Sequence, residues 1–317
     1  MKGQKTNITY LSIAILLFSL GGCGSVSLSQ VSQFGTASTE LNENAKKAFN
    51  LIDQVTVERQ LYSIASDTKT GPTDNSFNGL FKVAGNDAQA KEKAERLKLR
   101  LNALDALSGY SSALKKIVEA DVGSDIDSAS LELNTSLVEL KDTYQKASHQ
   151  DSKIDNETIG LLATAVNAIG RAVVEEKKRS AIKEIIIKVD PAVQQTAIMI
   201  SKDLGSNTDL AKYAYESLYN TRGSIQTAYN LEKKSNNFDS RYALLVRAKE
   251  INTAENSVSG FFNAVSKGSE AIAKTHAAMR KAVEQDQFSS AEVGKSLAEL
   301  QKQAKSVREF QSGLKEQ

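Results

Sequence analysis

The chain has 317 residues, of which 40% are apolar, 25% are charged and two are proline. Its net charge is +2, and the first 22 residues carry two charges, Lys2 and Lys5, so the remainder is formally neutral. A neutral chain without dense lysine or arginine runs argues against nucleic-acid binding, and the scarcity of proline favours long helices.

The first 23 residues have the layout of an export signal. Lys2 and Lys5 precede an apolar stretch over 8–20, which is too short to span a bilayer but is typical of a signal peptide. The stretch ends in Leu20-Gly21-Gly22-Cys23, which resembles the lipobox of bacterial lipoproteins, and Cys23 is the single cysteine of the chain. The alternative is an uncleaved anchor with an incidental cysteine.

The resemblance implies that residues 1–22 are a lipoprotein signal peptide, in which Leu20, Gly21 and Gly22 are recognised by the signal peptidase. It also implies that Cys23 carries a diacylglyceryl thioether and an N-acyl chain that hold the protein to a membrane. Gly24 stands where aspartate usually retains enteric-type lipoproteins at the inner membrane. We therefore expect a lipid-anchored protein of a Gram-negative-type cell envelope, at the outer membrane and facing the periplasm.

The segment that follows Cys23 is predicted to be a flexible tether extending to residue 36. It is rich in serine, glutamine and glycine, a composition typical of linkers. Val26, Leu28 and Val31 leave a short strand as the alternative.

From residue 37 onward the apolar residues recur with helical period. The pattern predicts helices over about 37–67, 86–120 and 126–149, with a loop at 68–85 that is rich in glycine and asparagine. A fourth helix is expected from about residue 156. Asp190-Pro191 predicts a new helix start, because aspartate caps free amides and proline is tolerated in the first turn. That helix is expected to break near 205–207.

The last two predicted helices carry the most regular signals. One contains six apolar residues at intervals of seven, typical of a coiled-coil seam: Leu244, Ile251, Val258, Val265, Ile272 and Met279. Small residues dominate three positions further on, so a partner helix is expected to approach closely. The final helix is expected to begin at Ser289-Ser290-Ala291-Glu292, which fits a capping box.

Together these patterns predict an all-α protein, an elongated antiparallel helical bundle over 37–317 with coiled-coil-like long helices. Asp190-Pro191 is taken as a boundary between two sub-bundles.

The sequence offers no catalytic or metal-binding constellation. There are two histidines, His149 and His276, and no glycine-rich phosphate loop is present. His276 lies beside the heptad seam and is interpreted as a packing residue. We therefore expect a protein that is not an enzyme and holds no metal or cofactor.

Two features are candidate partner surfaces. Tyr215 and Tyr219 share a helical face with Arg222, and tyrosine with arginine suits partner recognition, although tyrosines at a helix–helix contact are the simpler interpretation. The 68–85 loop carries Phe77 and Phe81, which either contact a partner or fold back onto the bundle.

The function expected from the sequence is that of a non-catalytic envelope lipoprotein whose periplasmic bundle binds a protein or the cell wall. The oligomeric state is left open. One alternative is a membrane-active bundle resembling helical pore-forming toxins, with 182–200 as its most apolar segment. Another is a bundle that binds or senses a small molecule.

Overall fold

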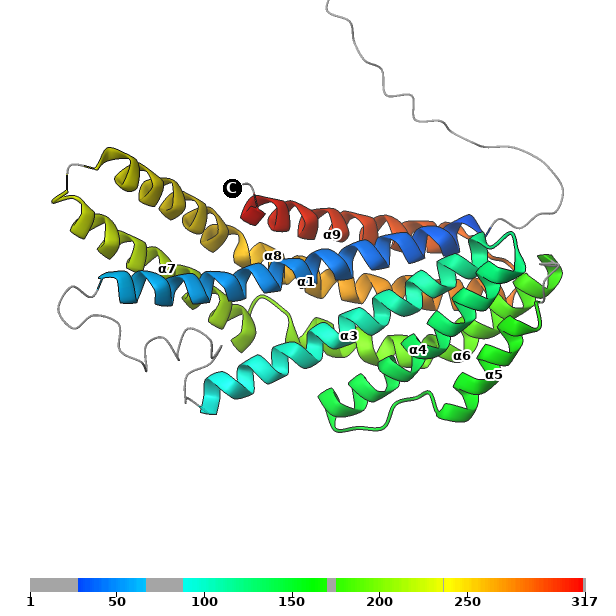
Figure 1. Ribbon diagram of the computed structural model, residues 1–317. Helices are drawn as coiled ribbons and strands as arrows, with labels where there is room; N and C mark the ends of the chain where they lie inside the picture. The colour runs from blue at the N-terminus through cyan, green and yellow to red at the C-terminus, as the bar shows by residue number, and fades with distance from the viewer. Residues whose placement is uncertain (1–27, 67–87, 170–174, 236, 316–317) are drawn as a thin grey trace, which may run out of the picture.

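Eight α-helices account for almost all of the chain that the computed structural model describes, namely residues 28–66, 88–169, 175–235 and 237–315, and these ranges contain no strand. They are α1 (Ser29–Ser66), α3 (Ala88–Glu119), α4 (Gly123–Ser148), α5 (Asn156–Asn167), α6 (Glu175–Asp203), α7 (Asp209–Glu232), α8 (Phe238–Glu284) and α9 (Ala291–Lys315). The predicted all-α helical bundle is confirmed (Figure 1).

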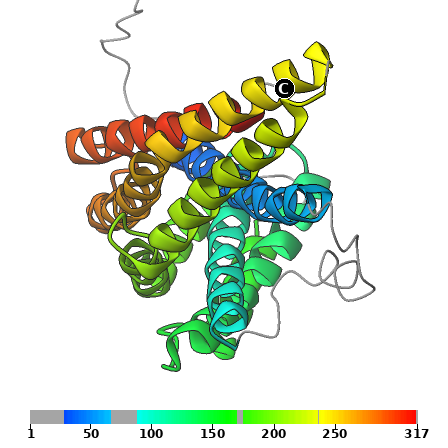
Figure 2. The same ribbon diagram turned by 90° about the vertical axis from the view of Figure 1, so that its left-hand side faces the viewer.

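The longest helices form the body of the bundle. Helix α8 lies against α6, α7 and α9, while α1 packs between α3 and α9 and also contacts α7. Helices α3 to α6 form the other side of the molecule (Figures 1 and 2). At about 1.5 Å per residue, the 47 residues of α8 extend for roughly 70 Å.

The first helix begins earlier than predicted, so the prediction of a tether to residue 36 is wrong for residues 29–36. Val31 and Phe34 are completely buried in the core, with the helical spacing of an apolar face. Gly35 lies so close to α3 that a Cβ atom would meet the Ser111 carbonyl oxygen at 2.6 Å. The serine-rich composition predicted a linker because only a few residues of this stretch, among them Val31 and Phe34, pack against the core.

The predicted helix start at Asp190-Pro191 is also wrong, because α6 runs through Pro191 without a break. The Asp190 side chain does not cap a helix but binds His276 of α8 at 2.9 Å. Residues from 31 to 310 share one continuous apolar core, so a sub-bundle boundary at 190 is not what the fold shows. Contacts of α6 with other helices, such as that between Asp190 and His276, outweigh the cost of the backbone N–H that Pro191 lacks.

Several other predicted boundaries are confirmed. Helix α6 ends just before the 205–207 break, and Thr208 caps α7 by accepting from the Ala211 amide. Helix α9 begins as expected, with Ser290 rather than Ser289 as the capping residue. The Gln30 amide of α1 makes hydrogen bonds to the backbone N–H and C=O of Ser290, which ties the start of α9 to the start of α1.

The heptad seam of α8 is buried from Ile251 to Met279, whereas Leu244 is only partly covered. Gly268 shows why small residues flank it: a Cβ atom there would lie 2.6 Å from a methyl carbon of Leu41 on α1. The seam is therefore the contact surface of α8 with its neighbours, as predicted.

The apolar segment 182–200 lies within α6, and most of its apolar residues are buried, whereas Ile198 is 43% exposed. Within the ranges that the structure describes, no helix is both long and apolar enough to cross a membrane.

Candidate functional site

The exposed face of α7 carries a stacked pair of tyrosines. Tyr215 and Tyr219 lie one helical turn apart, with ring centroids 6.3 Å apart and planes inclined by 21°. Their exposed fractions are 45% and 52%. So much exposure favours the surface interpretation over a contact between packed helices, because a packing residue loses most of its solvent contact.

Arg222 extends this stack and is held in place by α8. Its guanidinium carbon lies 5.2 Å from the centroid of Tyr219, within the range of a cation–π contact. Its Nε atom donates to Glu255 Oε2 at 2.7 Å, and Glu255 is itself buried on α8. The hydrogen bond to Glu255 raises the pKa of Arg222. The arrangement therefore presents two aromatic rings and a fixed cation to solvent, which we call the tyrosine patch.

Glu255 also influences the nearer tyrosine. Its negative charge is the largest cause of a raised pKa at the Tyr215 hydroxyl, followed by the effect of burial. The phenol therefore remains protonated. The sequence did not reveal Glu255 as part of the patch, because it lies 33 residues beyond Arg222 on another helix.

Two further tyrosines of α7, Tyr213 and Tyr229, are half-buried and are not members of the stack. The remaining predicted site residues lie outside the described part of the chain: Leu20, Gly21, Gly22, Cys23, Phe77 and Phe81.

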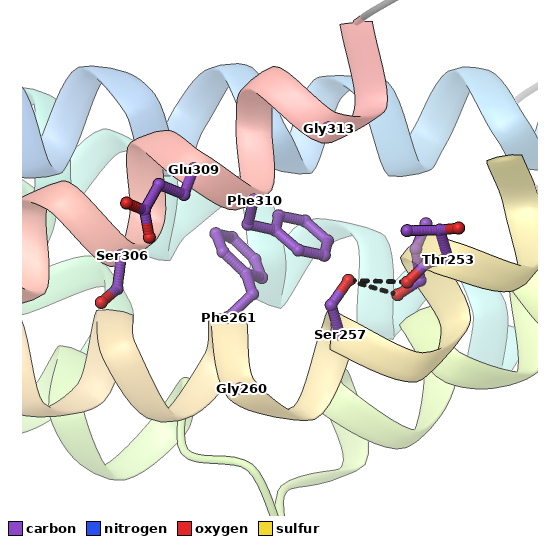
Figure 3. Close-up of a pocket in the computed structure, with 9 residues that line it drawn as sticks. Thr253, Ser257, Gly260, Phe261, Ser306, Glu309, Phe310 and Gly313 are labelled. Carbon is purple, nitrogen blue, oxygen red and sulfur yellow. Dashed lines mark hydrogen bonds between the residues drawn. The ribbon is translucent and has the colours of Figure 1, made fainter. Parts of the chain in front are cut away.

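A groove of about 450 Å³ lies between α8 and α9 (Figure 3). Phe261 and Phe310 form its aromatic wall, with ring centroids 4.4 Å apart and nearly parallel planes. Gly260 and Gly313 keep the groove open, since neither has a side chain to fill it. Its volume is that of a small-ligand site, although the groove is partly open to solvent.

A chain of hydrogen bonds crosses the core where α3, α6 and α8 meet. Asp190 accepts from or shares a proton with His276 Nδ1 at 2.9 Å, and His276 Nε2 lies 2.7 Å from the hydroxyl of Tyr110. Burial, and then the charge of Asp190, raises the pKa of Tyr110 well above its ordinary value. All three side chains are at least 94% buried, so no substrate reaches them.

This core chain is therefore a brace between helices, with both ring nitrogens of His276 partnered. That agrees with the interpretation of His276 as a packing residue. No group of three or more potential metal ligands gathers in the described part of the chain.

A further exposed region was not predicted from the sequence. The turn between α7 and α8 projects from one end of the bundle (Figures 1 and 2). The helix ends beside this turn carry large apolar side chains that are exposed to solvent: Leu231, Phe238, Tyr242, Leu245 and Val246. The available signal was Leu244-Leu245-Val246, because a helix that packs on one side cannot bury three consecutive apolar residues.

The chain matches no protein-family model, no curated protein and no solved structure.

Proposed function

We propose that this protein is a lipid-anchored, non-catalytic cell-envelope protein whose helical bundle binds a protein or cell-wall partner through the tyrosine patch. The lipobox-like sequence ending at Cys23 supports the anchor. The observation that carries the binding role is the preassembled stack of Tyr215, Tyr219 and Arg222 on the exposed face of α7.

The patch has the composition and rigidity of a binding hot spot. Tyrosine and arginine are enriched in such sites, and side chains ordered before binding lose less entropy when a partner arrives. The Arg222–Glu255 ion pair supplies this order, because Glu255 is buried and fixed to the body of the bundle. Stacked rings accept either an apolar protein side chain or the flat face of a sugar.

The anchor is tested by metabolic labelling with an alkyne fatty acid. We expect label on the full chain and none on a Cys23→Ser variant, because the cysteine is the acceptor of the lipid. Equal labelling of both proteins would contradict lipidation at this residue, and the readout does not depend on any other membrane contact.

The patch is tested in cells with a photo-cross-linking amino acid at position 219. We expect an adduct of one defined mass that disappears when Arg222→Ala is added, and none from the same probe at Leu131, an exposed residue of α4. Truncating a hot-spot residue such as Arg222 weakens binding by about 2 kcal/mol or more, which is roughly thirtyfold. Adducts of equal yield at 131 and 219 would refute a specific surface.

A cell-wall partner is tested with the same residues. Purified protein should sediment with insoluble peptidoglycan, and the Tyr215→Ala/Tyr219→Ala double variant should remain in solution. If both proteins sediment equally, the patch does not recognise the wall.

The groove of Figure 3 favours a second candidate function, the binding of a small apolar ligand. Fatty acids of graded chain length are suitable probes for a groove with two phenylalanine rings. A ligand of this kind should raise the melting temperature of the protein, and Gly313→Leu, which places a side chain at the groove, should abolish the rise. Equal increases in both proteins would place binding elsewhere.

A further inference from the structure

The end of α7, the turn that follows and the start of α8 project from the bundle as an arm, and we call residues 226–250 the arm tip. No described residue of the arm tip is buried, although most of it is helical. The body contacts the arm further down, where Thr221 of α7 donates to the Val55 carbonyl of α1. On α8, Arg247 is held by Glu58 of α1 and by Glu250, and the partly buried Leu244 packs against the core slightly nearer the tip.

The exposed apolar residues at the start of α8 form one stripe. Phe238, Tyr242, Leu245 and Val246 follow one another at helical spacing. The first two rings stack with centroids 6.0 Å apart and are 67% and 59% exposed. An amphipathic helix normally turns such a stripe toward a core, so this one presents a surface that is complementary to an apolar environment.

Cations surround the stripe. Lys233 and Lys234 lie at the turn, and Lys249 lies on the same helical face as the stripe, four residues after Leu245. None of these lysines forms an ion pair with a described residue. Of the nearby acidic groups, Glu250 pairs with Arg247, whereas Glu232 accepts from the neutral Ser235 hydroxyl and Asp239 lies in the first turn of α8, so both keep their charge. Residues 231–250 nevertheless carry five basic side chains, the three lysines with Arg241 and Arg247, against these three acidic ones.

We propose that the arm tip binds the surface of an anionic lipid bilayer. The stripe would enter the interface between headgroups and acyl chains, where aromatic side chains partition favourably. The three unpaired lysines would meet lipid phosphates, each contributing about 1 kcal/mol, or roughly a fivefold gain in affinity. A bilayer complements both the apolar stripe and the positive charge, whereas a second copy of the arm would complement the stripe and oppose its cations.

The inference is independent of the tyrosine patch and does not need the lipid on Cys23. The arm tip and the start of α1 lie at opposite ends of the bundle (Figure 1). In a lipid-anchored molecule the tip would provide a second membrane contact far from the first.

The test uses the chain from 24 to 317, which contains every described helix and no cysteine. Flotation with vesicles is compared for phosphatidylcholine alone and for a mixture with phosphatidylglycerol. We expect binding to the mixture, little binding to the neutral vesicles, and weaker binding in salt well above about 0.1 M, where surface charges are screened.

Two variants separate the contributions of the arm tip. Phe238→Ser/Tyr242→Ser/Leu245→Ser should abolish flotation, and Lys233→Gln/Lys234→Gln should weaken it about thirtyfold. The matched control is Leu131→Ser/Leu161→Ser, which changes equally exposed leucines of α4 and α5 and should float like the original chain.

A local probe keeps the test decisive if a variant folds poorly. Because the tested chain has no cysteine, Phe238→Cys carries a single environment-sensitive dye, whose emission should shift to the blue when anionic vesicles are added. The same dye at Leu131→Cys should not shift. Absence of a shift at 238, equal flotation of the stripe variant, or concentration-dependent dimers without vesicle binding would overturn the proposal.

Discussion

The two halves of helix α8 have similar helical patterns but different surroundings. From Ile251 onward the heptad residues are buried against α1, α6, α7 and α9, whereas no residue of α8 before Ile251 is buried. Apolar side chains occur in both halves, as Phe261 and Phe238 illustrate. The difference shows that periodicity specifies a helix and its apolar face, while burial depends on whether another element reaches that face.

The polar residues follow the same division. In the core half, His276 joins Tyr110 and Asp190 in a set of hydrogen bonds that Gln194 and Arg280 extend. In the exposed half, Lys249 has no carboxylate partner among the described residues, and the same holds for Lys233 and Lys234 just before α8. The first arrangement stabilises the fold, and the second leaves charge available for an external ligand.

The strongest test of this comparison replaces one phenylalanine in each half. Phe261 is buried and contacts Phe49, Phe262 and Phe310, so Phe261→Ala should reduce the free energy of unfolding by about 3–5 kcal/mol. Phe238→Ala should change it by less than about 0.5 kcal/mol, because the ring is mostly in water. Urea unfolding followed by circular dichroism measures both. Similar losses of unfolding free energy in the two variants would mean that both halves of α8 are packed equally well against the rest of the protein.

The core brace is tested by removing its central residue. His276→Leu keeps a buried side chain of similar size but leaves Tyr110 and Asp190 without that partner, so we expect a loss of about 3 kcal/mol in unfolding free energy. Tyr110→Phe is the milder control, with a loss of about 1 kcal/mol, because the His276–Asp190 contact remains. A loss for His276→Leu no greater than that for the control would argue against a brace.

The brace should also give the core a dependence on pH. Burial raises the pKa of Asp190, but the hydrogen bond and charge of His276, with bonds from Gln194 and Arg280, outweigh burial and leave that pKa below its ordinary value of 3.8. The ionised carboxyl therefore stabilises the fold above about pH 4, and this contribution disappears as the pH falls further. Asp190→Asn should cost about 2 kcal/mol at neutral pH.

The measurement is the difference in unfolding free energy between Asp190→Asn and the original chain as a function of pH. We expect the difference to shrink as the pH falls below about 4. A constant difference from neutral to acidic pH would show that ionisation of Asp190 does not stabilise the core.

The smallest effects are expected at two glycines outside α8, the buried Gly35 of α1 and the exposed Gly223 of α7. Gly35→Ala would force α1 away from the Ser111 carbonyl and should cost about 1–3 kcal/mol. Gly223→Ala on the exposed side of α7 meets no atom within 4 Å and should stabilise the helix by about 0.5–1 kcal/mol. Thermal melting distinguishes the two, and a stabilising Gly35→Ala would mean that α1 and α3 are less closely packed than the structure shows.

Much of the fold was predictable from local patterns. The seam from Ile251 to Met279, the helix starts at Asn156 and Ala291 and the break near 205 all follow from side-chain spacing or capping residues. The errors have a common origin. Ser29 to Thr36 and Pro191 have unfavourable local signals, and contacts with α3 and α8 override them.

The candidate site was predictable only in part. The spacing of Tyr215, Tyr219 and Arg222 placed them on one face, because residues three and four apart adjoin in a helix. Glu255, which holds Arg222, and the arm tip were missed, since both depend on how α7 and α8 pack.

By itself the sequence determined that the chain forms long amphipathic helices and which residues lie on the apolar face of each, because helical periodicity acts over a few residues. Only the tertiary structure decided that Asp190 meets His276 and Tyr110 and that the first turns of α8 remain uncovered. Those outcomes depend on the mutual position of helices that are distant in the chain, and local residue spacing carries no information about that position.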